Sequence, residues 1–199
     1  MYTFIQETPK HRLNPPTYSR YSQYKDILIV DFKKRCAYCN DTNKYRIRSF
    51  AIDHFIPQKP LNFKPKIPAN QYDNLIYCCS YCNRAKWNKW PTDDEAIEND
   101  GNKGFVKPTR DKYKDLFFRN MNGRIIPIEN SNLARYIKDE LMLWHPIHSL
   151  MWRIEKLMDL EDKVDLKLKE INNDELSAIH SKITKEITDI FRQIFNSND

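Results

Sequence analysis

The fold is indicated most directly by residues 74–90, which read NLIYCCSYCNRAKWNKW. The first five positions include β-branched and aromatic side chains and predict a short strand. The second half begins at Ser80, a residue that favours helix starts, and is followed by Pro91, which stops a helix. Two cysteines, Cys79 and Cys82, lie at the junction. The stretch therefore predicts a strand, a cysteine turn and a helix in direct succession.

The residues upstream predict a second strand and a second cysteine turn. Residues 50–57 form a β-branched and aromatic run that ends in proline, which predicts a strand. Residues 58–72 contain three prolines and predict a loop. Apolar spacing near 3.6 predicts a short helix over 21–35, and Cys36 to Cys39 follows it as a tight turn. The predicted order is therefore strand, loop, strand, helix.

The second half of the chain is predicted to be mostly helical. Asn122-Gly123 predicts a hairpin turn between residues 115–119 and 124–128. Apolar residues at helical spacing follow from Asn130 onward, and a long stripe over 176–194 is more typical of core than of a partner surface. The sequence thus predicts an α+β protein. We divide it into an arm and helix (1–35), a core (36–92) and a hairpin with a helical region (93–199).

Charge is distributed unevenly along the 199 residues. Residues 1–92 contain 16 Lys and Arg against 6 Asp and Glu, a net charge of +10, whereas residues 93–199 carry −4. A basic front half favours a polyanionic partner there. Only three glycines are present, which argues against a glycine-rich phosphate loop. No apolar run of about eighteen residues predicts a membrane span, and no signal-peptide pattern is visible, so we expect a cytoplasmic protein with no membrane partner.

Four of the five cysteines have the spacing of a zinc site. Cys36 and Cys39 form one Cys-x-x-Cys pair, and Cys79 and Cys82 form another. Each such turn places two thiolates on one side, and two turns complete a tetrahedron without an open position. The pattern predicts a structural zinc ion. Cys78 is left over and is expected to be buried as a small apolar residue, because neighbours in a strand point to opposite faces.

Three further elements lie between and beside the cysteine pairs, and they resemble the HNH endonuclease family. That family has an Asp-His pair followed by a proline, a central Asn-Leu, and a final His or Asn beside the second cysteine pair. Here these are Asp53-His54 with Pro57, Asn74-Leu75, and Asn83. The resemblance covers roughly residues 36–90. It implies a ββα-metal core with a zinc knuckle and a hydrolase that cuts phosphodiester bonds in nucleic acid, with DNA the favoured substrate.

The residue types suit that chemistry. His54 can take a proton from water near neutral pH, and Asp53 offers an oxygen ligand for Mg²⁺ or Mn²⁺. The resemblance implies that Asn83 is the second ligand of this catalytic cation and that Asn74 holds the loop and orients the base. Basic side chains on the same helix are expected to contact phosphates without reading sequence; they are Arg84, Lys86 and Lys89.

Two rival functions stay open at this point. One is a zinc-knuckle module that binds nucleic acid without cleaving it, although such a module needs no Asp53, His54 and Asn83 together. The other is a scaffold or toxin subunit that is active only with a partner. The whole chain is also similar in plan to small stand-alone bacterial HNH proteins, some of which act in anti-phage defence beside an ATPase. That likeness implies an ATPase partner.

Overall fold

The computed structural model describes residues 1–46, 50–171 and 173–196, and it combines helices with two small sheets. It is α+β, as the sequence predicts. The strands are β1 (Tyr2–Thr3), β2 (Ala51–His54), β3 (Leu75–Cys78), β4 (Phe117–Arg119) and β5 (Ile125–Pro127). The helices are α1 (Lys25–Asp31), α2 (Ser80–Lys86), α3 (Asp111–Lys114), α4 (Asn132–Glu140), α5 (Pro146–Glu170) and α6 (Asp174–Asn196), with 3₁₀ turns at Tyr21–Tyr24 and Tyr72–Asn74.

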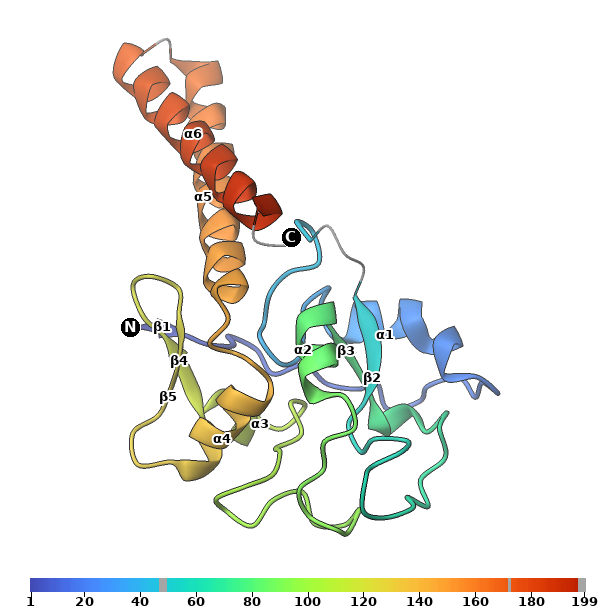
Figure 1. Cartoon of the computed structure of the whole chain (residues 1–199). Helices are drawn as coiled ribbons and strands as arrows, with labels where there is room; N and C mark the ends of the chain where they lie inside the picture. The colour runs from blue at the N-terminus through green and yellow to red at the C-terminus, as the bar shows by residue number, and fades with distance from the viewer. Residues whose placement is uncertain (47–49, 172, 197–199) are drawn as a thin grey trace.

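The strands β2 and β3 form an antiparallel pair, and α2 lies beside them (Figure 1). His54 is opposite Leu75, and Asp53 is opposite Ile76. All four residues of β3 are buried, so this strand lies inside the protein. The strand β2 is shorter than the predicted 50–57, because the chain turns away after His54 toward the proline-rich loop. The predicted order of strand, loop, strand and helix is present.

The helix α2 differs from the prediction at both ends. Its N-cap is Cys79, whose sulfur accepts a hydrogen bond from the Cys82 amide at 3.5 Å, so the cap is a cysteine and Ser80 is the first helical residue. The helix ends at Lys86, four residues before the predicted Trp90. It ends because Trp87 has a positive φ of 45°, which cannot continue a right-handed helix.

The second sheet has the order β1-β4-β5. The β4–β5 hairpin turns at the predicted place, and Gly123 has a φ of 75°, which suits glycine. The pairing of β1 with β4 was not predicted, since two exposed residues at the start of the chain carry no periodic signal. This pairing ties the N-terminal arm to a segment more than a hundred residues away.

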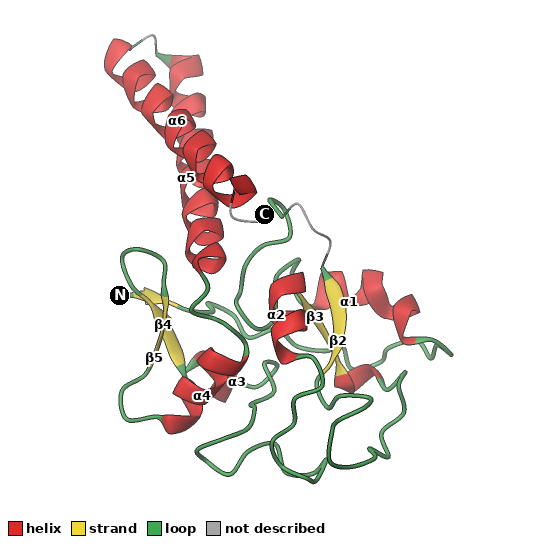
Figure 2. Cartoon of the chain, viewed as in Figure 1, coloured by secondary structure: helices red, strands yellow, loops and turns green. Residues whose placement is uncertain are grey.

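The helices α5 and α6 form an antiparallel hairpin that projects from the rest of the molecule (Figures 1 and 2). The apolar stripe of α6 is buried against α5, as the preference for internal packing predicts; its buried members are Ile183, Ile187, Ile190 and Ile194. The helix α5 lies within the region predicted to be helical from Asn130 onward and runs to Glu170. In the part of the chain that the structure covers, no helix is long and apolar enough to cross a membrane.

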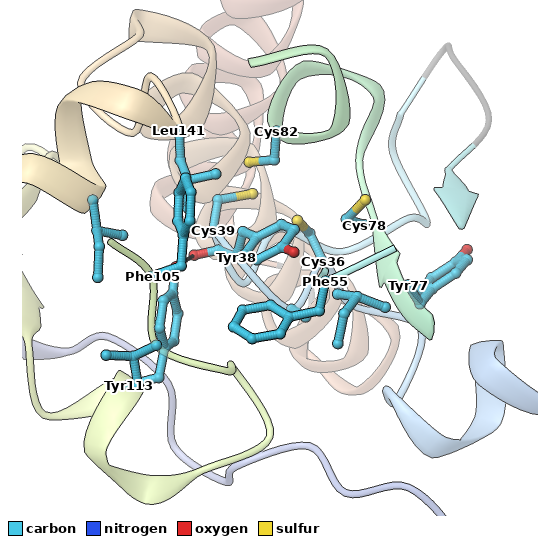
Figure 3. Close-up of a cluster of buried hydrophobic side chains, with 14 of the residues drawn as sticks. Cys36, Tyr38, Cys39, Phe55, Tyr77, Cys78, Cys82, Phe105, Tyr113 and Leu141 are labelled. Carbon is cyan, nitrogen blue, oxygen red and sulfur yellow. Dashed lines mark hydrogen bonds between the residues drawn. The ribbon is translucent and has the colours of Figure 1, made fainter. Parts of the chain in front are cut away.

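The main core draws on all three predicted segments. One cluster of buried side chains extends from Phe4 to Leu143 and includes the cysteines, Tyr38, Phe55 and Phe105 (Figure 3). The β4–β5 hairpin and α4 therefore cover the same core as the cysteine turns. The division at residues 35 and 92 stays a prediction.

Candidate functional site

Four cysteines form one buried cluster. Cys36 and Cys39 lie in the turn after α1, and Cys79 and Cys82 lie where β3 passes into α2. Their sulfur atoms all lie within 4.8 Å of one another, and Cys39 Sγ is 3.7 Å from Cys79 Sγ. Sulfur atoms around a tetrahedral zinc with bonds of about 2.3 Å are about 3.8 Å apart. The predicted ligand set is therefore brought together at a spacing that is compatible with zinc.

The fifth cysteine lies outside this cluster. Figure 3 shows the sulfur of Cys78 apart from the sulfurs of Cys36, Cys39 and Cys82. Cys78 is fully buried, and its Sγ is 3.9 Å from the carbonyl oxygen of Ala51 on the neighbouring strand. Its place agrees with the expected alternation along β3.

A buried network of charges lies behind the cysteine cluster. Asp41 forms ion pairs with Arg46 and Arg119, and its Oδ2 is 2.9 Å from His148 Nδ1. Arg119 also donates to the carbonyl oxygen of Cys39 at 2.7 Å. Burial opposes ionisation of the Asp41 carboxyl group, but its basic neighbours outweigh burial and lower its pKa. The network thus fixes the first cysteine turn to the β4–β5 hairpin, through Arg119, and to the start of α5, through His148.

His54 is held through one ring nitrogen. Its Nε2 is 2.8 Å from the carbonyl oxygen of Ala69 and 2.8 Å from the amide nitrogen Nε2 of Gln58, and the Tyr21 ring packs edge-on with a centroid distance of 4.8 Å. A carbonyl only accepts, whereas an amide can turn either end toward the ring. The Ala69 contact therefore places the proton on Nε2 and leaves a lone pair on Nδ1. Burial lowers the pKa of His54, which favours the neutral ring.

Asp53 precedes His54 in β2 and is almost fully buried. Its Oδ2 accepts a 2.6 Å hydrogen bond from the Tyr38 hydroxyl and lies 3.5 Å from Lys86 Nζ. Burial raises the pKa of Asp53, against the effect of Lys86 and Tyr38. Its Oδ1 has no hydrogen-bond partner among the described residues, and the side chain is 6% exposed. One carboxylate oxygen is therefore left for a further ligand.

Asn74 fastens the chain that follows His54. Its Oδ1 accepts from the Ile56 amide at 2.8 Å, and its Nδ2 donates to the Ile56 carbonyl at 3.0 Å. Its own carbonyl accepts from the Phe55 amide at 2.8 Å. Three hydrogen bonds thus hold the two residues after His54, and Asn74 itself is buried.

Asn83 lies in α2, the helix that follows the second cysteine pair. Its backbone is part of the helix, and its side chain is partly buried. Within residues 1–46, 50–171 and 173–196, this side chain makes no hydrogen bond. Its amide oxygen is therefore available as a ligand atom.

Residues 36–89 match a family model described as HNH endonuclease. Neither a curated protein nor a solved structure matches the chain. The matched residues, here called the HNH segment, contain both cysteine pairs, Asp53, His54, Asn74 and Asn83. At the level of this family, the match points to a nuclease that binds metal.

The three basic residues that were predicted to contact phosphates differ in how exposed they are. Arg84 is exposed, and Lys89 forms a partly exposed ion pair with Glu140 at 2.8 Å. Lys86 has no exposed surface: its Nζ donates to the His54 carbonyl at 3.1 Å and lies beside Asp53. The structure contradicts the predicted phosphate contact of Lys86, because the ammonium group of this residue faces the core.

Three residues around the site were not predicted. Tyr38 binds Asp53, Gln58 contacts His54, and Tyr21 packs on the His54 ring. Gln58 lies four residues after His54, but the chain between them is not helical, so this spacing carried no signal. Tyr38 falls inside the first cysteine turn, where its hydroxyl gave no indication of a partner 15 residues away.

Proposed function

We propose that this protein is a metal-dependent endonuclease that hydrolyses phosphodiester bonds in nucleic acid, with DNA as the favoured substrate. The observation that carries the proposal is the arrangement of His54. Its Nε2 meets the Ala69 carbonyl and its Nδ1 keeps a lone pair, within a segment that matches the HNH endonuclease family. A neutral imidazole with one free nitrogen is the group that takes a proton from an attacking water.

The other residues have positioning and ligand roles in this proposal. Asn74 keeps the chain after His54 in place through its bonds to Ile56, so the ring cannot drift from the reacting water. Asp53 and Asn83 would hold Mg²⁺ or Mn²⁺; their free Oδ1 atom and free amide group are hard donors that fit such an ion. The bound cation would supply positive charge to the phosphate and to the leaving oxygen.

The four cysteines would hold a structural zinc ion, because four thiolates leave no open coordination position. Arg84 and Lys89 remain the proposed phosphate contacts. A role in anti-phage defence and an ATPase partner rest on likeness of plan and stay predictions. A cytoplasmic location rests on the sequence patterns for targeting and also stays a prediction.

The main rival function is a module that binds nucleic acid without cutting it. A binding module gains nothing from a histidine whose proton position is fixed, nor from the buried Asn74 bonds that hold its chain. These features favour the enzyme.

The test is cleavage by purified protein. Plasmid, linear DNA and RNA are incubated with Mg²⁺ or Mn²⁺, and parallel samples are dialysed free of divalent ions. His54→Ala should lower the cleavage rate by about 10²–10⁴-fold with zinc content unchanged. His180→Ala, at a partly exposed histidine of α6 outside the HNH segment, is the matched control and should cleave as the parent does. Full cleavage by His54→Ala under both metals would contradict the proposal.

A further inference from the structure

The backbone of Trp87 has a conformation that suits glycine. Directly after α2, Trp87 has φ 45° and ψ −122°, while its amide donates to the carbonyl of Asn83 at 2.9 Å. A positive φ brings Cβ close to the backbone, and for a bulky residue this conformation is an outlier. A strained backbone conformation persists where packing or function requires that particular side chain. Such residues cluster at functional sites.

Packing does not compensate for this strain. The Trp87 side chain is 72% exposed. Trp90 lies three residues later and is 5% exposed, with its ring against Phe55 and Phe105 and its Nε1 donating to the Asp94 carbonyl. The chain therefore uses Trp90 for its core. Among the described residues, Trp87 makes no ring contact and no side-chain hydrogen bond.

Trp87 directly follows the helix that carries two residues linked to the proposed site. Lys86 precedes it and donates to the His54 carbonyl, and Asn83 lies one turn earlier on α2. Arg84, three residues before Trp87, is exposed. Residues 1–92, which include all of these, carry a net charge of +10. An exposed arginine close to Trp87, in a basic part of the chain, thus favours a polyanion over an apolar protein surface.

We propose that Trp87 is a stacking platform for an unpaired nucleobase of the substrate, beside the bond to be cut; this rests on the proposed function. An exposed indole offers a flat π-face to any base, and a basic residue nearby holds the phosphates. A base inside a duplex has both faces covered by its neighbours and cannot stack on Trp87 without leaving them. The substrate therefore contains a single-stranded or unpaired segment at the site.

Binding is measured in the His54→Ala background by fluorescence anisotropy, with a 15-nucleotide single strand and the matching duplex. Trp87→Gly should lower the affinity for the single strand by roughly five- to a hundredfold and change duplex affinity much less. Its melting temperature should be at least that of the parent, because glycine relieves the strain. Trp87→Phe should keep most of the affinity. Trp144→Ala, at an exposed tryptophan in the acidic half, is the matched control and should bind as the parent does.

Equal single-strand affinity of Trp87→Gly and parent would overturn the inference, and so would equal losses for single strand and duplex. A lower melting temperature for Trp87→Gly would show that the indole serves the fold. DNA and RNA strands of the same sequence identify the sugar. If the His54→Ala protein binds no nucleic acid and the wild-type protein cuts none, the proposed function itself fails. If the wild-type protein cuts nucleic acid but Trp87→Gly binds the single strand as tightly as its parent, only the stacking inference fails.

Discussion

Replacing Lys86 by methionine should destabilise the protein strongly, because a buried carboxylate would lose its cation. Lys86 Nζ is 3.5 Å from Asp53 Oδ2, and the two side chains are 0% and 6% exposed. At that distance and an effective dielectric constant of about 20, Coulomb's law gives an attraction of about 5 kcal/mol. Burial opposes the pair, since it raises the pKa of Asp53 and lowers that of Lys86. We expect Lys86→Met to lower the free energy of unfolding by about 3–5 kcal/mol.

Asp53→Asn in the same protein should recover part of that loss, because asparagine needs no cation. The double variant should be more stable than the sum of the single losses predicts, with a coupling energy of at least about 2 kcal/mol. Urea unfolding of the zinc-loaded protein, followed by tryptophan fluorescence, measures all four species. Lys89→Met is the matched control and should cost at most about 1 kcal/mol, since its ion pair is partly exposed. Strict additivity of the two losses would refute the reasoning.

Two further predictions concern the metal and the N-terminal arm. Cys79→Ser should lose zinc and stability, whereas Cys78→Ser should keep one zinc per chain; elemental analysis counts the metal, and equal zinc loss in both variants would contradict the ligand set. Burial opposes ionisation of Asp31, but hydrogen bonds from Arg12 and Tyr72 outweigh it and lower its pKa below 3.8. The stability from these bonds is therefore present above that value and lost as pH falls through the lower folded pKa. Between pH 5 and pH 2 the free energy of unfolding, measured with urea, should fall by at least about 1 kcal/mol more in the wild-type protein than in Asp31→Asn. Equal losses in the two proteins would argue against these bonds.

Short sequence motifs predicted the structural features that depend on residues close together in the chain. Asn122-Gly123 predicted the hairpin, and the paired Cys-x-x-Cys motifs predicted the four-cysteine cluster, since turn and ligand geometry are set within a few positions. The apolar stripe of α6 predicted its packing for the same reason. The roles of His54 and Asn83 remain predictions, although the structure gives each a free ligand or acceptor atom.

Three features depended on contacts that sequence spacing does not contain. The pairing of Tyr2 with Arg119 joins the ends of a long loop of chain. Lys86 was expected at the surface because lysines are rarely buried without a partner, and its partner Asp53 lies 33 positions earlier, on the strand β2. The end of α2 at Trp87 follows from one backbone angle that tryptophan seldom adopts.

The charge network around Asp41 has a consequence for the order in which the protein is assembled during synthesis. Arg46 follows Asp41 by 5 residues, but Arg119 follows by 78 and His148 by 107. At about 5–20 residues per second, Arg119 is made roughly 4–16 s after Asp41, well after the last cysteine of the cluster. A nascent chain can therefore gather its four thiolates while the carboxylate beside them still lacks two of its partners. Gathering of the thiolates and burial of Asp41 can thus be separate events in time, and an interrupted chain that ends before the β4–β5 hairpin would carry the four cysteines without Arg119 and His148.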